Sequence, residues 1–155
     1  MTSIVLTPIG YVRSTRAAIV DDDWDHETSH VELVSSFPED ALAGLDSFSH
    51  VEVLFHMSGV PDDKIETGAR HPRNNADWPR VGIFAQRGKN RPNRLGLSVC
   101  RIVRVTGREV HVEGLDAIDG TPVLDLKPYV RQFGPRGEVH QPSWMDELMR
   151  GYFSA

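Results

Sequence analysis

The sequence has a single cysteine, Cys100, among its 155 residues. One thiol excludes an internal disulfide and any metal cage built from several cysteines, and it is typical of a protein from a reducing compartment. No stretch approaches about 18 consecutive apolar residues, and the N-terminus shows no basic leader followed by an apolar run. We therefore expect a cytoplasmic protein that does not enter a membrane.

Residues for nucleophilic or metal catalysis are also scarce. Ser98 stands in G-L-S-V rather than in a G-x-S-x-G elbow, and Cys100 lies in an apolar run, where a thiol is usually a core residue. A zinc-dependent hydrolase is one alternative, because His50, Glu52 and His56 would share a face of a strand. Every second residue of a strand shares a face whether or not a metal is bound, so we expect no metal site.

Acidic residues are absent from the 31 residues between Trp78 and Arg108, which carry eight Lys or Arg. Residues 1–77 carry 14 acids against 5 bases and residues 109–155 carry 8 against 4, so that the net charge is −5. Within the basic segment, an apolar run from Val81 leads into a polar loop and a second apolar run ending at Val99. This pattern predicts a rigidly held loop that binds an anion such as phosphate or carboxylate.

Hydrophobic alternation and Gly or Pro punctuation predict mostly short strands. We expect strands at 4–6, 9–12, 30–34, 49–57, 97–105, 109–115 and 123–126, a short helix at 37–45, and a helix at 143–153 with Ser143 as N-cap. There is no β-α-β alternation, which excludes a doubly wound nucleotide fold. The fold class predicted from these elements is all-β (mainly β), as a barrel or a two-layer fold.

Two further features leave alternatives open. Asp116, Asp119 and Asp125 could be paired carboxylates for acid and base chemistry, but turns and strand ends explain them equally well. Trp24 stands in an otherwise acidic loop, where an aromatic residue often covers a pocket or a partner.

Four motifs together resemble one known family. They are IGYVRS at 9–14, FSHVEVLFHM at 48–57, VGIFAQR with RPN and GLS at 81–98, and GLDAIDGTPVLDLKPY at 114–129. These blocks keep their order across residues 4–130, and they resemble the TsaA-like family, whose characterised members are the TrmO tRNA methyltransferases.

The resemblance implies a compact β-barrel with one or two short helices that works as a homodimer and binds S-adenosylmethionine. It implies methyl transfer, without a metal, to N6 of the modified adenosine beside the tRNA anticodon, at position 37. A non-catalytic β-barrel module that keeps an S-adenosylmethionine or RNA site is the alternative.

The resemblance also implies roles for individual residues. The cofactor set is Met57, Ser58, Gly59, Arg87, Leu97, Gly114, Leu115, Asp116 and Ala117. The substrate set is Lys89, Arg91, Arg94 and Lys127. Candidates for a catalytic role are Asp116, Asp119 and Tyr129.

The chain departs from the family in two respects. Bacterial TrmO proteins usually continue into a second domain, whereas here we expect a TsaA-like barrel over residues 1–137 and a C-terminal tail and helix over 138–155, packed on the barrel or on a partner subunit. The usual R-P-N-P-I-G motif has Arg94 in place of its second proline.

Overall fold

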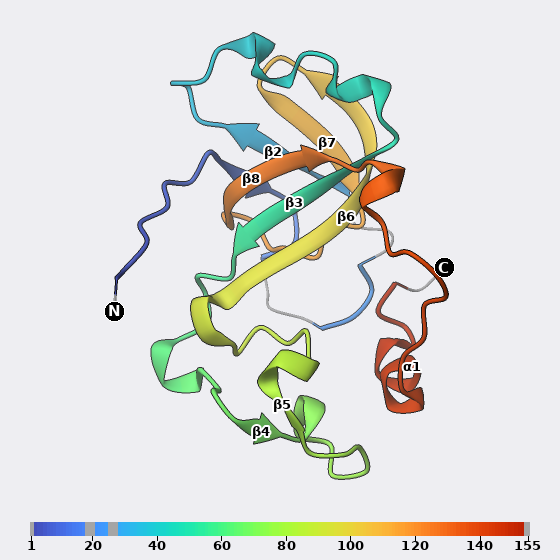
Figure 1. Cartoon of the computed structure of the whole chain (residues 1–155). Coiled ribbons are helices and arrows are strands. Elements are labelled where there is room, and N and C mark those ends of the chain that lie inside the picture. The colour runs from blue at the N-terminus through green and yellow to red at the C-terminus, as the bar shows by residue number, and fades with distance from the viewer. Residues whose placement is uncertain (1, 18–20, 25–27, 154–155) are drawn as a thin grey trace.

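A closed antiparallel β-barrel forms the centre of the molecule in the computed structural model, which describes residues 2–17, 21–24 and 28–153. Within that part of the chain the strands run in the order β1, β2, β7, β6, β3, β8, and β8 pairs back with β1 (Figure 1). Their bounds are Gly10–Arg13 (β1), Thr28–Leu33 (β2), His50–His56 (β3), Leu95–Thr106 (β6), Glu109–Glu113 (β7) and Pro122–Pro128 (β8). The predicted mainly-β barrel is confirmed.

Smaller elements lie outside the barrel. Strands β4 (Ala69–Arg70) and β5 (Val81–Gly82) form a two-stranded sheet, and α1 spans Ser143–Met149. Figure 1 shows β4, β5 and α1 toward one end of the molecule and β2 and β7 toward the other. The 3-10 helices are η1 (Glu39–Leu42), η2 (Leu45–Ser47), η3 (Asp62–Lys64), η4 (Pro72–Asn74), η5 (Ile83–Ala85), η6 (Pro92–Arg94) and η7 (Arg131–Phe133). Among the described helices, none has the length and apolar character needed to cross a membrane.

The core follows from strand alternation. In β3 the predicted inward residues Val51, Val53 and Phe55 are buried, and their neighbours in sequence are half-buried. Cys100 is 1% exposed, and burial, with a smaller contribution from the charge of Asp116, raises the pKa of its thiol to about 12. The remaining members of the core are Val12, Val31, Val110, Val112, Leu115, Ala117 and Val123.

One predicted strand and one apolar run differ from what the sequence indicates. Residues 4–6 form no strand and leave their side chains exposed, and pairing with β8 starts at Ile9, beyond Pro8. The apolar run at Val81 contributes two strand residues and then turns into η5. Its partner is β4 rather than a barrel strand, so the loop after it begins outside the barrel.

The predicted helices are also shorter than expected. The segment 37–45 is divided at Ala43 and Gly44: Ala43 has a non-helical ψ of 129° after η1, and Gly44 has a left-handed φ of 87° before η2. In α1 the cap position is Pro142 and no side chain caps the helix, so the predicted N-cap role of Ser143 is wrong.

The residues that follow α1 are fixed by backbone hydrogen bonds to a loop far away in sequence. The amides of Asp23 and Trp24 donate to the carbonyls of Gly151 (3.1 Å) and Tyr152 (2.8 Å). Trp24 is 3% exposed beneath this contact. The residues after α1 are therefore held against the loop that precedes β2.

Candidate functional site

A pocket of about 1090 Å³ opens beside strand β6. Its walls come from the loop after β3 (57–60), the basic loop before η6 (86–92), the turn before β8 (116–121) and the C-terminal residues 144–153. The pocket thus collects segments that are well separated in sequence, and the barrel supplies the strand that supports them.

The wall that β6 contributes depends on a close contact between a glycine and an aromatic ring. Gly96 lies opposite Phe55 in the pairing of β6 with β3. A Cβ atom at Gly96 would lie 2.4 Å from the ring of Phe55, which is 2% exposed and lines the pocket. A residue with a side chain at position 96 would therefore displace the ring.

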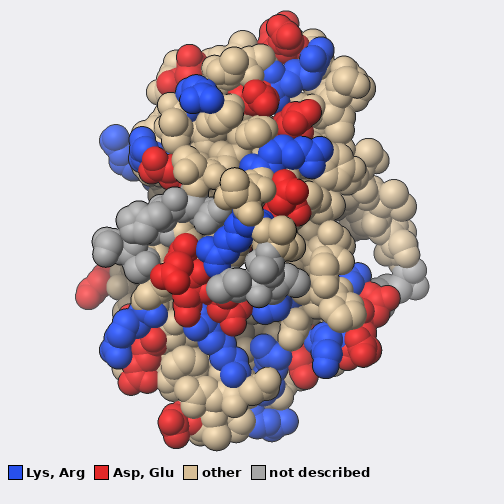
Figure 2. All heavy atoms as spheres, turned by 180° about the vertical axis from the view of Figure 1, so that it is seen from behind, with Lys and Arg blue, Asp and Glu red and all other residues tan. Residues whose placement is uncertain are grey.

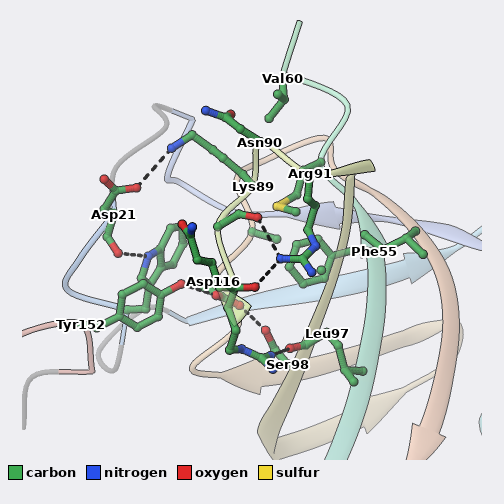
Figure 3. Close-up of a pocket in the computed structure, with 18 of the residues that line it drawn as sticks. Asp21, Phe55, Val60, Lys89, Asn90, Arg91, Leu97, Ser98, Asp116 and Tyr152 are labelled. Carbon is green, nitrogen blue, oxygen red and sulfur yellow. Dashed lines mark hydrogen bonds and ion pairs between the residues drawn. The ribbon is translucent and has the colours of Figure 1, made fainter. Parts of the chain in front are cut away.

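Asp116 is the carboxylate that the pocket holds most firmly. The hydroxyl of Ser98 on β6 donates a hydrogen bond to its Oδ1 and the phenol of Tyr152 donates to its Oδ2 (Figure 3). Burial, and then the charge of Asp116, raises the pKa of Tyr152, so the phenol keeps its proton and remains a donor. The carboxylate is thereby fixed in orientation, while its remaining lone pairs stay available.

Asp119 is engaged in building the adjoining turn. Its Oδ1 accepts a hydrogen bond from the amide of Ser14 (3.0 Å), and its own amide donates to the carbonyl of Arg16 (2.8 Å). Gly120 follows with a φ of 82°, a conformation that favours glycine. Asp119 lines the pocket, but these bonds give it a structural task that Asp116 does not share.

Two arginine side chains of the basic loop donate hydrogen bonds that hold the loop in place. Arg91 donates to the carbonyl of Gln86 (2.6 Å), and Arg87 donates to the carbonyl of Leu97 on β6 (2.9 Å). Lys89 reaches across to the carboxylate of Asp21 (3.2 Å; Figure 3). All three cationic residues line the pocket.

Arg94 has a different position. Its guanidinium donates to the carbonyl of Val60 (2.6 Å) and pairs with Asp62 (2.9 Å), and its carbonyl accepts from the amide of Met57 (2.8 Å). Its φ of 51° is one that proline cannot adopt. The departure from the family motif thus accompanies a backbone conformation in which Arg94 holds the loop after β3.

The basic segment is not a separate basic surface in three dimensions. Acids from the flanking segments pair with Lys89, Arg94 and Arg101, the last through Glu113 at 2.7 Å. Figure 2 shows Lys and Arg side chains interspersed with Asp and Glu on the face opposite to that of Figure 1. The long-range fold therefore balances a charge that is unbalanced along the sequence.

The structure brings many of the predicted site residues together. The pocket is lined by Met57, Ser58, Gly59, Arg87, Leu97, Asp116 and Ala117 from the cofactor set, and by Lys89, Arg91 and Asp119. Five predicted residues are not among its lining: Gly114, Leu115, Arg94, Lys127 and Tyr129. Leu115 is fully buried in the core, and Lys127 is exposed beside Asp125 on β8 (3.6 Å).

Several residues of the pocket have no signal in the sequence. In the sequence Ser98 reads as a strand residue, and Tyr152 falls within the helix predicted at 143–153. Their common partner, Asp116, lies 18 and 36 positions away from them. Trp24 does line the pocket, as the isolated aromatic residue suggested.

The metal candidates His50, Glu52 and His56 do not form a cluster. In the described residues a different set, His30, Glu109 and His111, converges.

Comparison with known proteins identifies related chains. The family model for the tRNA-methyltransferase O N-terminal domain matches residues 18–134. A mouse tRNA (adenine(37)-N6)-methyltransferase is 34% identical over 141 residues, which are 84% of this chain and 32% of the mouse protein. A protein of Methanothermobacter thermautotrophicus named "Probable S-adenosyl-L-methionine-binding protein" is 34% identical over 86% of this chain and 96% of its own length.

A solved structure agrees with the sequence comparison. The crystal structure of TrmO from Pseudomonas aeruginosa matches with a TM-score of 0.73 at 29% identity, over 92% of this chain and 62% of that one. The chain thus spans about a third of the mouse relative and under two thirds of the bacterial structure.

Proposed function

The chain belongs to the tRNA-methyltransferase O N-terminal domain family, and from this membership we propose that it is an S-adenosylmethionine-dependent methyltransferase that methylates N6 of adenosine 37 in tRNA. The observation that carries the proposal is the pocket around Asp116, whose carboxylate is fixed by Ser98 and Tyr152. The same pocket contains most of the residues that the family motifs assign to the cofactor.

The donor groups of the pocket fit an adenosylated amino acid. Phe55, Met57 and Leu97 provide apolar surface for a purine ring, and Ser58 and Gly59 provide polar backbone beside them. Asp116 offers a carboxylate for hydroxyl or amino groups, and these residues would hold the cofactor. The volume of about 1090 Å³ exceeds what a ligand of this size needs, which leaves room for an extruded base.

The reaction requires positioning more than covalent catalysis. The cofactor supplies a methyl group on a sulfonium, and transfer to an amine needs in-line placement and no metal or enzyme nucleophile. The exocyclic nitrogen must lose a proton as it gains the methyl group. Of the three catalytic candidates we assign this proton to Asp116, because Asp119 is engaged in the turn and Tyr129 does not line the pocket.

We propose that tRNA approaches over the basic loop. Lys89 and Arg91 lie at the pocket, where cationic groups can contact the phosphates that flank an extruded base. For Lys127, which is 70% exposed on β8, we propose a more distant phosphate contact. Arg94 is engaged by Val60 and Asp62, and its effect on tRNA would pass through the loop that it holds.

A homodimer is part of the same proposal. The outward residues of β6 include Leu97 (47% exposed), Val99 (50%) and Val103 (41%), which form an apolar stripe that Arg101 interrupts between Val99 and Val103. Such a stripe is suited to a second copy of the chain, and its first half borders the pocket.

Two further statements complete the proposal. The chain is divided into a barrel over 1–137 and a C-terminal segment over 138–155, and it works in the cytoplasm, where tRNA is available.

The decisive experiment uses the purified full chain with methyl-labelled S-adenosylmethionine and tRNA from cells that lack this modification. Nucleosides from the digested tRNA are separated and identified by mass spectrometry, and cofactor binding is measured by calorimetry. Label on N6 of adenosine 37 would support the proposal. Binding without transfer would favour the non-catalytic module, and no binding at millimolar cofactor would overturn both.

Light scattering of the wild type and of Val103→Asp tests the dimer.

A further inference from the structure

Two histidines face each other on the outer surface of the barrel, on strands that Figure 1 shows at the end opposite α1. His30 on β2 is paired with His111 on β7. The amide of Leu33 donates to the carbonyl of Arg108, which makes that pair a hydrogen-bonded one. By alternation the His30–His111 pair is a non-hydrogen-bonded one, in which opposing side chains come closest.

A carboxylate completes the group from the diagonal position. The Nε2 atom of His30 lies 3.2 Å from Oε1 of Glu109, and the Nε2 atom of His111 lies 3.6 Å from Oε2 of the same residue. One ligand atom from each residue lies within 4.8 Å of the others, and the imidazole ring centroids are 4.7 Å apart. The three side chains are between 19% and 38% exposed, so they are both sheltered and accessible.

We propose that His30, Glu109 and His111 bind a divalent transition-metal ion of the Zn²⁺ class that joins β2 to β7. Two imidazole nitrogens and one carboxylate are a typical ligand set for zinc, with water in the fourth position. Tetrahedral zinc with such ligands keeps donor atoms about 3.3 Å apart. The N···O separations of 3.2 and 3.6 Å, one to each oxygen of Glu109, are close to that value. None of the three residues lines the pocket around Asp116, so the site is separate from the methyl-transfer reaction.

The neighbouring charges allow this binding but also compete with it. Arg13 lies opposite His30 and Arg104 opposite His111, while Glu32 is opposite Glu109. Arg13 is already paired with Glu32 at 3.6 Å. Arg104 carries a positive charge that opposes binding of a cation at His111, and the carboxylate of Glu109 offsets it. The competing arrangement is a direct contact of the two imidazole rings with Glu109, without any ion.

The test measures Zn²⁺ binding to the full chain without a histidine tag, after removal of metal with a chelator. Titration calorimetry should give one ion per chain, and Zn²⁺ should raise the thermal midpoint because it binds the folded state. With Co²⁺ as the probe, a visible absorption band reports ligand geometry. His30→Gln, Glu109→Gln and His111→Gln should each weaken Zn²⁺ binding by at least about tenfold and abolish most of the thermal shift.

Matched controls come from histidines elsewhere on the barrel. His50→Gln and His56→Gln, on β3, should leave Zn²⁺ affinity and the thermal shift unchanged. Circular dichroism of each variant without metal shows whether its barrel is intact. The proposal is overturned if the wild type takes up no Zn²⁺ at micromolar concentration, or if the His30→Gln/His111→Gln double variant binds as tightly as the wild type. Neither result would affect the proposed methyl transfer, which is assayed without added metal.

Discussion

The phenol of Tyr152 donates a hydrogen bond to Asp116 across 36 positions of sequence, and so joins the C-terminal segment to the turn before β8. Ser98 on β6 donates to the other oxygen of the same carboxylate. A barrel strand, a turn and the end of the chain therefore meet at one acid. If Asp116 accepts the proton of the target amine, the C-terminal segment is part of the site and not only an appendage of the barrel.

Removing the phenol of Tyr152 should impair both cofactor binding and the stability of the fold. Tyr152→Phe deletes one donor to a charged acceptor, so we expect cofactor binding about tenfold weaker and a free energy of unfolding lower by about 1–2 kcal/mol. Calorimetry with S-adenosylmethionine and urea denaturation measure the two effects. Tyr129→Phe is the matched control, since Tyr129 does not line the pocket, and it should leave affinity unchanged. Equal losses in both variants would contradict the role given to Tyr152.

The charge of Asp116 should be needed for turnover. Asp116→Asn keeps the shape but removes the acceptor for a proton, so we expect the methylation rate to fall at least about 100-fold. Asp125→Asn is the control, because Asp125 pairs with Lys127 on β8 and its Oδ1 accepts from the amide of Leu126 (2.9 Å). Single-turnover assays with tRNA that lacks only the N6 methyl group separate this effect from cofactor affinity. A rate unchanged in Asp116→Asn would show that the proton leaves to solvent.

The barrel could be predicted because each strand carries its own signal. In β3 the alternation of apolar and polar residues places Val51, Val53 and Phe55 on the inward face, without reference to the rest of the chain. The residues of β7 alternate in the same way. The bond between Tyr152 and Asp116 has no local signal, since it exists only after the chain end reaches the pocket. Lys89 likewise looks unpaired in sequence, and its partner Asp21 lies 68 positions away.

Local propensity misled where tertiary pairing decided the structure. The run at Val81 is apolar enough for a barrel strand, but its two strand residues pair with β4 outside the barrel. The motif around Arg94 suggested a solvent-facing cation, whereas the structure directs its guanidinium to Val60 and Asp62. In both cases the partner is contributed by the long loop between β3 and β5, which has too little periodicity to be placed from sequence.

The contact of Gly96 with Phe55 should tolerate no side chain. In Gly96→Ala the new Cβ would lie 2.4 Å from the ring, so the ring must move, and we expect a loss of about 1–3 kcal/mol in the free energy of unfolding together with weaker cofactor binding. Gly82→Ala is the control: no atom lies within 4 Å of its Cβ, and its φ of −63° suits alanine. Urea denaturation compares the two variants. Equal stability would show that β6 and β3 are farther apart than described.

Arg94 and Lys89 should have different effects. Arg94→Ala removes the bonds to Val60 and Asp62, so we expect a loss of about 1 kcal/mol in stability and several-fold weaker cofactor binding through the loop after β3. Lys89→Ala breaks an exposed pair with Asp21 and should change stability by less than about 0.5 kcal/mol. It should instead weaken tRNA binding and reduce the salt slope by about 1. The opposite pattern would make Arg94 the direct tRNA contact.

The buried thiol should make stability fall in alkaline solution. Burial, and then the charge of Asp116, raises the pKa of Cys100 to about 12, whereas the thiol of an unfolded chain ionises near about 8.5. Above that pH the unfolded state releases a proton that the folded state keeps, so stability falls as pH rises toward 12. Cys100→Ala lacks this contribution while retaining the other titrating groups. Above about pH 8.5, the free energy of unfolding of the wild type should therefore fall relative to that of Cys100→Ala. The fall should be up to about 1.4 kcal/mol per pH unit. Urea denaturation between pH 7.5 and about 10.5 measures it, and parallel curves for the two proteins would mean that the thiol is accessible to solvent.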